Sequence, residues 1–295
     1  MRVGGRAEWL LEPSTPEEFR QAWIAALERG GPVRVLGGGA NLLVHDGELP
    51  GVVITTERMT RTFRAEDTRE PVLVAWAGAS MPGLVRTARE LGLTGLEGLV
   101  GVPGHLGGGI AMNAGGRWGE LWDVVERVHL LVPDGELVER PRAECSPSYR
   151  NGGLGDDVAL GAVLRLEHGD REEIRERMRA YLAEKSAAQP VTERSSGCIF
   201  KNPDPELSDG RSAGKLVEDC GGKGLTRGDA VVSPKHGNFI VNRGGATAAD
   251  VLGLIDDLKR LVADRTGIVL DREVRVWEAG AVGESGRKGL PGRFR

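Results

Sequence analysis

The sequence has few cysteines, no excess of basic residues and no long apolar run, and each absence excludes a class of protein. Its three cysteines, Cys145, Cys198 and Cys220, are an odd number without C-x-x-C spacing, which argues against a disulfide framework and a structural zinc site. A formal net charge of −4 lacks the basic excess expected of a nucleic-acid-binding protein. No uninterrupted apolar run approaches the ~18 residues that span a bilayer, and the first residues carry no signal-peptide pattern. We therefore expect a cytoplasmic protein that uses no nucleic acid, membrane or metal.

The order of apolar runs and turn-forming residues predicts alternating strands and helices. A length of 295 residues is enough for two or three domains. Caps, glycine stops and helical spacing predict helices over 14–30, 82–91, 170–188, 212–220 and 247–264. Short apolar runs predict strands over 33–36, 51–55, 72–77, 124–132, 136–140, 158–166, 238–241 and 268–277, and another near Ala230. Pro133-Asp134-Gly135 predicts a hairpin turn between the strands at 124–132 and 136–140.

Glycine is the residue in excess, with 45 copies that cluster between apolar runs. The segment 37–41, Gly-Gly-Gly-Ala-Asn, follows the predicted strand at 33–36 and leads towards the strand at 51–55, in a strand, glycine turn, strand unit. Its consecutive N–H groups could form a nest for phosphate oxygens, although a plain tight turn explains the segment equally well. No amphipathic helix follows, so the Rossmann fingerprint of NAD-binding proteins is not matched.

The glycine-rich segment from Gly95 to Gly116 is more specific. Each glycine inside a helix costs about 1 kcal/mol, so a helix core would not tolerate so many of them. Close approach of the backbone to a large, flat ligand is the better explanation. We expect the N–H groups to meet the polar edge of an isoalloxazine ring and four apolar residues to cover its face. These residues are Leu96, Leu99, Val102 and Ile110.

Several motifs together resemble one family. G-G-G-A-N-L-L-V at 37–44 and G-V-P-G-H-L-G-G-G-I-A-M-N-A-G at 101–115 are similar to the FAD-binding half of the UDP-N-acetylenolpyruvoylglucosamine reductases. The likeness continues in motifs of the second half, at 148–150 (S-Y-R), 197–203 (G-C-I-F-K-N-P), 213–216 (A-G-K-L), 235–242 (K-H-G-N-F-I-V-N) and 273–275 (E-V-R). Because the motifs follow the family's order from about residue 3 to residue 278, they are far more specific together than singly.

The resemblance implies an α+β fold of the vanillyl-alcohol-oxidase/PCMH-like class. In that fold a two-part FAD-binding domain, here 1–60 and 61–168, precedes a C-terminal α+β substrate-binding domain, here 169–279. We expect residues 280–295, which lack periodicity, to form a disordered tail. The chain is similar to the shorter, type II members of the family, since its length leaves no room for the extra tyrosine-bearing loop of the longer subgroup. It also lacks the usual extra N-terminal helix, and Cys198 stands where many relatives have serine.

The resemblance also implies a reaction, the reduction of UDP-N-acetylenolpyruvoylglucosamine to UDP-N-acetylmuramate in peptidoglycan precursor synthesis. Noncovalent FAD would take a hydride from NADPH and give it to the vinyl carbon of the substrate, in a monomeric enzyme. The enolate formed beside a carboxylate demands fixed positive charge, which implies Arg150. The Cys198 thiol, with a reference pKa of roughly 8.5, would protonate the neighbouring carbon. Glu273 would assist at the enolate, either as a buried neutral acid or through water.

The same resemblance implies the binding residues. Those for FAD are Gly37, Gly38, Gly39, Ala40, Asn41, Leu42, Gly78, Gly101, Val102, Pro103, Gly104, Gly107, Gly108, Ala111, Asn113, Ala114 and Gly115. Those for the UDP-sugar substrate are Tyr149, Lys201, Asn202 and Lys215.

Simpler interpretations of the same residues stay open at this point. Arg150 could form a surface ion pair, Cys198 could be a buried structural cysteine, and Glu273 could pair with Arg275 on one face of a strand. Two other functions also fit parts of the pattern. One is an oxidase of the same fold that passes electrons to oxygen, and the other is a non-catalytic UDP-sugar-binding protein.

Overall fold

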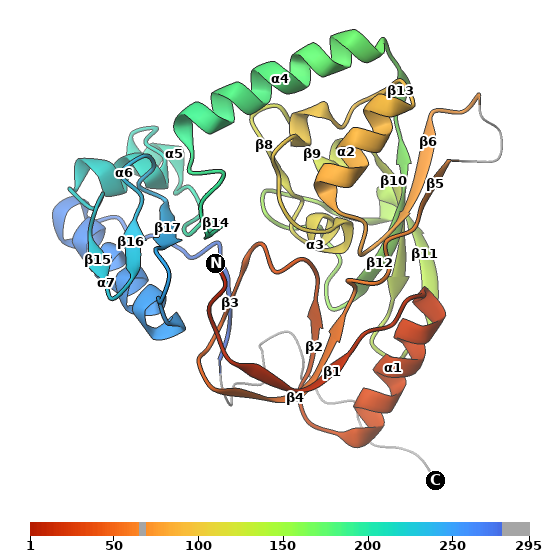
Figure 1. The fold of residues 1–295 in the computed structure, drawn as a ribbon, viewed down its shortest axis with the longest axis horizontal. Helices are drawn as coiled ribbons and strands as arrows, with labels where there is room; N and C mark the ends of the chain where they lie inside the picture. The colour runs from red at the N-terminus through yellow and green to blue at the C-terminus, as the bar shows by residue number, and fades with distance from the viewer. Residues whose placement is uncertain (65–68, 279–295) are drawn as a thin grey trace.

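Three groups of strands and helices follow one another along the chain (Figure 1). The computed structural model describes residues 1–64 and 69–278, so the predicted disordered tail at 280–295 lies outside the described residues. Across the described residues, none of the helices has the length and hydropathy of a membrane span.

The first group is a three-stranded parallel sheet with one helix against it. Its elements are β1 (Arg6–Leu11), α1 (Pro16–Arg29), β2 (Val33–Leu36), β3 (Leu42–Val44) and β4 (Glu48–Thr55). The sheet order is β1-β4-β2, whereas β3 leaves this sheet and pairs in parallel with β18 (Arg275–Trp277). The prediction that a glycine turn joins two strands of one compact unit, at 33–36 and 51–55, is therefore wrong in one respect. The glycine turn leads out of the sheet, because two parallel neighbours such as β2 and β4 cannot be joined by a tight turn.

The second group is a five-stranded sheet in the order β11-β10-β12-β6-β5, with every neighbouring pair antiparallel. Its elements are β5 (Thr62–Arg64), β6 (Val72–Trp76), α2 (Met81–Glu90), β7 (Leu93–Thr94), η1 (Glu97–Leu99), α3 (Leu106–Ala111), β8 (Gly115–Gly116), β9 (Gly119–Glu120), η2 (Leu121–Asp123), β10 (Val125–Leu131), β11 (Leu137–Pro141), η3 (Arg142–Glu144), β12 (Val158–Arg165) and β13 (Glu167–His168). Helices α2 and α3 lie on the same side of the sheet (Figure 1). The pairing of β10 with β11 confirms the predicted hairpin.

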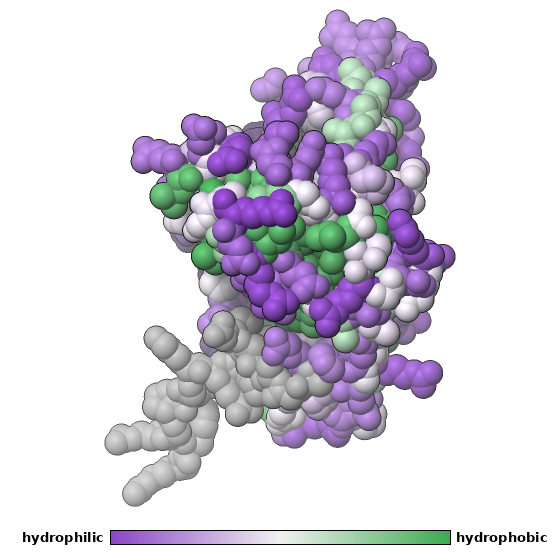
Figure 2. All heavy atoms as spheres, turned by 90° about the vertical axis from the view of Figure 1, so that its left-hand side faces the viewer, coloured by the Kyte–Doolittle hydropathy of each residue, from purple (hydrophilic) through white to green (hydrophobic). Residues whose placement is uncertain are grey.

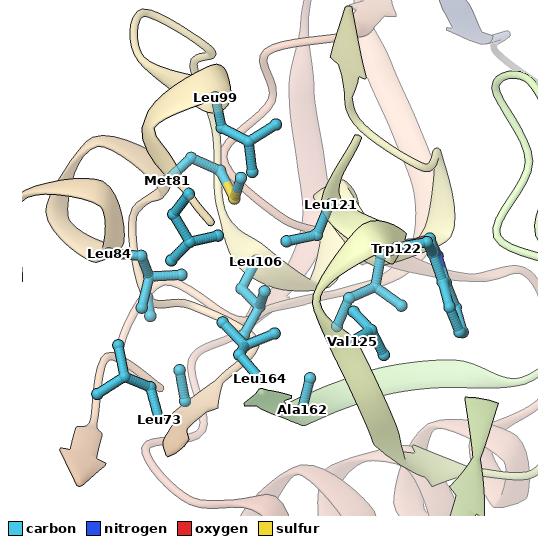
Figure 3. Packing of buried hydrophobic residues seen from close by; sticks show 14 of the residues in the cluster. Leu73, Met81, Leu84, Leu99, Leu106, Leu121, Trp122, Val125, Ala162 and Leu164 are labelled. Atoms are coloured by element: carbon cyan, nitrogen blue, oxygen red, sulfur yellow. The ribbon is translucent and has the colours of Figure 1, made fainter. Parts of the chain in front are cut away.

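The glycine-rich segment differs from its prediction in two ways. Residues 106–111 form helix α3 in spite of three consecutive glycines. Leu96, Leu99 and Ile110, which were expected to cover a ring, are at most 2% exposed and belong to the hydrophobic core with Trp122. Figure 3 shows Leu99 pointing towards Met81 inside this core. Burial against the sheet stabilises a short helix that glycine propensity alone would not support, and it withdraws these side chains from any ligand.

The third group is an α+β unit that follows the connecting helix α4 (Arg171–Ala188). Its elements are β14 (Ser195–Cys198), α5 (Pro205–Ser208), α6 (Ala213–Asp219), β15 (Thr226–Arg227), β16 (Ala230–Val232), β17 (Phe239–Asn242), α7 (Ala248–Thr266) and β18. Four of the strands form an antiparallel sheet in the order β14-β17-β16-β15. The predicted strand at 268–277 was too long, because only 275–277 form a strand among the described residues, and they pair with β3 of the first group. Arg272 forms an isolated bridge with Phe200.

The three groups do not keep entirely separate hydrophobic cores. Phe19 of α1 packs with Leu131 and Leu160 of the five-stranded sheet, and Leu43 of β3 packs in the core of the third group. Hydrophilic side chains cover most of the face of the molecule shown in Figure 2. The predicted domain boundaries at 60 and 168 stay a prediction. Residues on both sides of each boundary share apolar contacts, whereas few contacts are expected to cross a boundary between domains.

The third group contains a histidine whose burial predicts a pH effect on stability. Burial, assisted by Lys223, lowers the pKa of His236, whose Nδ1 accepts a hydrogen bond from the Asn238 N–H at 3.1 Å. Because the unfolded chain binds this proton more readily, the stabilisation is present above about pH 6.5 and is lost as the pH falls below it. His236→Gln keeps an acceptor without a titration. We expect the Tm difference between about pH 8 and about pH 5 to shrink by roughly 2 °C in this variant, measured by calorimetry; an unchanged difference would contradict the assignment.

Candidate active site

An ion pair between distant parts of the chain forms the centre of the site. Arg150 lies in a tight loop closed by hydrogen bonds between Ser148 and Asn151, and its φ of 58° is left-handed. Its Nε donates to Oε1 of Glu273 at 2.6 Å, and its Nη1 donates to the Gly115 carbonyl at 3.4 Å. A non-glycine residue holds such a backbone conformation only when its surroundings enforce it, and such residues cluster at functional sites.

Glu273 lies in the short segment before β18 rather than on the strand. The side chains of Arg150 and Glu273 are only 16% and 11% exposed, so this is a largely buried pair. The predicted alternative, a strand pair between Glu273 and Arg275, is wrong because Arg275 is the first residue of β18 and Glu273 instead meets Arg150. Burial raises the pKa of Glu273, and the charge of Arg150 opposes that rise.

Cys198 ends β14 and shares the electrostatic environment of this pair. It follows Gly197, whose φ is +79°, and pairs with Phe239 across an irregular stretch of sheet. Burial of the thiol, with a smaller contribution from the charge of Glu273, raises the pKa of Cys198 to about 12, against the opposing charge of Arg150. The thiol therefore stays protonated over the whole working range of an enzyme, more firmly than its reference pKa of roughly 8.5 indicates.

Two glycine loops, at 37–41 and 101–108, face each other beside the site, and we call the space between them the cradle. A Cβ added to Gly38 would lie 2.8 Å from the Gly104 Cα and 3.1 Å from His105 Cδ2, so these loops touch. Of the atoms in residues 1–64 and 69–278, a Cβ on Gly37 would have only the Gly108 N within 4 Å, at 3.8 Å, and a Cβ on Gly108 would have none there outside its own helix. The loops therefore close at one end and stay open between Gly37 and Gly108.

The three glycines of α3 differ in what requires them. A Cβ on Gly107 would lie 2.9 Å from that of Ala77, and one on Gly109 would lie 3.0 Å from Leu121 Cδ2, so packing explains both. Packing does not explain Gly108, which is exposed and faces open space. The buried Nδ1 of His105 also has no hydrogen-bond partner within residues 1–64 and 69–278. A ligand that approaches the backbone closely fits both observations.

The other predicted cofactor residues surround this cradle. Positive φ angles at Gly39, Gly101 and Gly104 shape the loops. Gly78 and His105 also line a cavity of about 500 Å³. The remaining members of the predicted set lie on the same two segments, at Ala40, Asn41, Leu42, Val102, Pro103, Ala111 and Ala114.

Asn113 has a different place from the direct cofactor contact that was predicted. Its side chain is 3% exposed, donates to Glu120 at 2.7 Å and to the Ser148 carbonyl at 3.3 Å, and accepts from the Trp122 N–H. Both ends of the amide are therefore used within the protein. The side chain of Asn113 therefore links the second glycine-rich segment to the loop that carries Arg150.

The predicted substrate residues are only partly brought together. Tyr149 is 47% exposed and its ring lies 4.9 Å from the Arg150 guanidinium. The Lys201 N–H donates to the Asp271 carbonyl at 2.9 Å, two residues before Glu273, and the charge of Lys201 opposes the rise of the Glu273 pKa. Asn202 caps the start of α6 by accepting from Ala213 N at 3.1 Å. Lys215 instead lies on the exposed side of α6, 2.9 Å from Asp219. A solvent-exposed pair on its own helix explains Lys215 without a substrate.

Sequence reasoning missed a group of side chains on α4. The Lys185 Nζ donates to the Val100 carbonyl at 2.6 Å and lies 5.4 Å from the Trp118 ring. Trp118 also stacks on Tyr181, with ring centroids 5.0 Å apart. Tyr181 and Lys185 are four residues apart on one helix face, which was the available signal. This group holds the beginning of the second glycine loop against α4.

Comparisons with known proteins agree with this geometry. The model for "UDP-N-acetylenolpyruvoylglucosamine reductase, C-terminal domain" matches residues 189–277, and the model for "FAD binding domain" matches residues 7–140. The UDP-N-acetylenolpyruvoylglucosamine reductase of Desulfosudis oleivorans is 38% identical over 93% of this chain and 90% of its own length. That of Geobacter metallireducens is 38% identical over 94% and 89%. The crystal structure of the Thermus caldophilus reductase covers 94% of both chains, with a TM-score of 0.78 and 38% identity.

Proposed function

This chain belongs to the UDP-N-acetylenolpyruvoylglucosamine reductase family, and from that premise we propose how its residues carry out the reaction. It is an FAD-dependent oxidoreductase that reduces the enolpyruvyl group of UDP-N-acetylenolpyruvoylglucosamine in peptidoglycan precursor synthesis. One observation carries the proposal for the site. Arg150 and Glu273 form a largely buried ion pair, and the Glu273 N–H donates to the Ile199 carbonyl at 2.7 Å, which brings the neighbouring Cys198 close to the pair.

The cradle fits noncovalent FAD. When bound, FAD would relay reducing equivalents from NADPH to the enolpyruvyl double bond. Gly37 and Gly108 leave the backbone of both loops free to approach a phosphate or ring edge, and the loop from Gly37 to Asn41 supplies N–H groups. At the closed end of the cradle, the buried Nδ1 of His105 has no hydrogen-bond partner among the described residues. Acid precipitation should release the yellow colour into the supernatant.

Arg150 would bind the substrate carboxylate and stabilise the negative charge that develops beside it. Its Nε is occupied by Glu273, which fixes the plane of the guanidinium. One N–H of Nη1 donates to the Gly115 carbonyl at 3.4 Å. The other N–H of Nη1 and those of Nη2 would form two parallel hydrogen bonds to a carboxylate. Glu273 therefore orients Arg150, and burial of the pair strengthens its interaction with substrate.

Cys198 would hold the proton that the substrate carbon receives. A pKa of about 12 keeps the thiol neutral, so the donor is loaded before substrate arrives. The charge of Arg150 opposes the rise of this pKa, which makes the proton easier to release at the moment of transfer. Tyr149, Lys201 and Asn202 are the substrate-binding residues that lie nearest, whereas Lys215 has the weakest support.

The remaining parts of the proposal concern the co-substrate and the state of the enzyme. We propose NADPH as the reductant and a monomer that works in the cytoplasm. The decisive experiment records the flavin spectrum in a stopped-flow instrument during two steps. NADPH should bleach the flavin, and UDP-N-acetylenolpyruvoylglucosamine should restore its colour faster than air. Faster return with air would support the oxidase, and a colourless protein would support the non-catalytic alternative.

Gly108→Ala tests the cradle directly. Outside its own helix, the new methyl group has no atom of the described residues within 4 Å, and alanine favours helix by roughly 0.5–1 kcal/mol, so the apoprotein should melt at the same or a higher temperature. If FAD lies over this backbone, its dissociation constant should rise by about tenfold, or 1.4 kcal/mol. Fluorescence titration of apoprotein with FAD measures this. Gly109→Ala is the matched control. Its methyl group would lie 3.0 Å from Leu121 Cδ2 and 3.3 Å from Met81 Sδ in the buried core, so it should lower Tm instead. Equal FAD affinity in Gly108→Ala and wild type would place the cofactor elsewhere.

A further inference from the structure

A short segment of the first group holds the third group at two separate places. At one end, Asn41 contacts the segment that carries Glu273. At the other end, the carboxylate of Asp46 accepts from the N–H groups of Ala248 and Ala249, at 2.9 Å each, at the start of α7. Between them, β3 pairs with β18. The first contact touches the active site and the second does not.

Asn41 fixes the backbone of Glu273 from the side of the glycine loop. Its Nδ2 donates to the Glu273 carbonyl at 3.1 Å, and its own carbonyl accepts from the Arg275 N–H at 3.0 Å. On the other side, the Glu273 N–H donates to the Ile199 carbonyl at 2.7 Å, one residue from Cys198. The Glu273 backbone is therefore held between the cofactor loop and the segment that carries the thiol. Its carboxylate reaches Arg150 from that fixed base.

We propose that Asn41 is a positioning residue for substrate reduction, whose side chain acts through Glu273 and not as a ligand of FAD. This inference rests on the proposed function. Because Asn41 directly follows Gly37–Ala40, a single side-chain amide joins the cradle to the Arg150–Glu273 pair. A displacement of the Glu273 backbone would turn the guanidinium that it orients. Misplacement of a catalytic group by ~1 Å costs up to about 10²-fold in rate.

Asn41→Asp tests this with almost no change of shape. The donating amide becomes a carboxylate oxygen that faces the Glu273 carbonyl, so an attraction becomes a repulsion. We expect return of the flavin colour with UDP-N-acetylenolpyruvoylglucosamine to slow by about 10- to 100-fold. NADPH bleaching and the FAD dissociation constant should stay within about twofold of wild type. Asn41→Ala removes the donor without adding a repulsion. Its rate of flavin reoxidation by the substrate should therefore lie between those of wild type and Asn41→Asp.

Asp46→Asn is the matched control, since it weakens the other contact of the same segment with an equally small change. It should lower Tm and leave both half-reactions at wild-type rates. Wild-type rates in Asn41→Asp would overturn the inference, and so would a loss of FAD binding in that variant, because Asn41 would then serve the cofactor. Equal slowing in Asp46→Asn would also overturn it. Failure of the wild-type protein to be reoxidised by the substrate is a separate result that removes the proposed function itself.

Discussion

Cys198→Ala is expected to slow reoxidation of the reduced flavin by the enolpyruvyl substrate by about 10²- to 10⁴-fold, the usual loss for a general acid. FAD binding and NADPH bleaching should stay near their wild-type values, because no proton is delivered to the substrate in that step. Cys198→Ser should recover much of the loss. With its pKa raised to about 12, the thiol is an acid closer in strength to a hydroxyl than free cysteine is, so serine is a conservative replacement here.

Stopped-flow measurement of the two half-reactions separates this role from a structural one. Cys145 and Cys220 are buried cysteines in other parts of the protein, and none of the three is in a disulfide within the described residues. Cys145→Ala and Cys220→Ala should lower stability alone. If Cys198→Ala behaves like these two variants, with normal substrate reduction and a lower Tm, Cys198 is a core residue.

Arg150→Met should reduce kcat/KM for the enolpyruvyl substrate by about 10²- to 10³-fold, the typical result of removing one stabilising donor from a developing oxyanion. Arg150→Lys should recover only part of the loss, because an ammonium cannot form two parallel hydrogen bonds in one plane. Arg140→Met is the matched control. Arg140 forms a partly buried pair with Asp157 at 2.5 Å, and losing it should affect stability alone.

The same substitution predicts a change in the pH dependence of stability. Burial already raises the pKa of Glu273, and removing the opposing charge of Arg150 raises it further. A carboxyl group with a raised folded pKa contributes stability at low pH, and that contribution is lost as the pH rises through the folded pKa. The Tm deficit of Arg150→Met relative to wild type should therefore grow from about pH 4.5 upwards. A deficit that is constant with pH would mean that Glu273 finds another partner, and Arg150→Met/Glu273→Gln should remove the pH dependence.

Local patterns predicted most of the secondary structure well. Thr15 caps α1 and Gly30 ends it, which confirms the helix predicted at 14–30, because caps and glycine stops depend on neighbours in the sequence. The errors concern packing. Leu96, Leu99 and Ile110 were assigned to a ligand and lie in the core, since periodicity shows that a residue is apolar and not what it packs against.

The sequence by itself determined the family, the use of FAD and the identity of the three proposed catalytic residues, because family motifs are ordered strings of residues that can be read without coordinates. Only the tertiary structure decided that Glu273 meets Arg150 rather than Arg275, and that Asn41 holds the backbone of Glu273. These partners are 123 and 232 residues apart. The structure also raised the pKa of the Cys198 thiol through burial, which depends on every segment that surrounds it. Contacts at such separations follow from how sheets and helices pack, and no local pattern of residues encodes them.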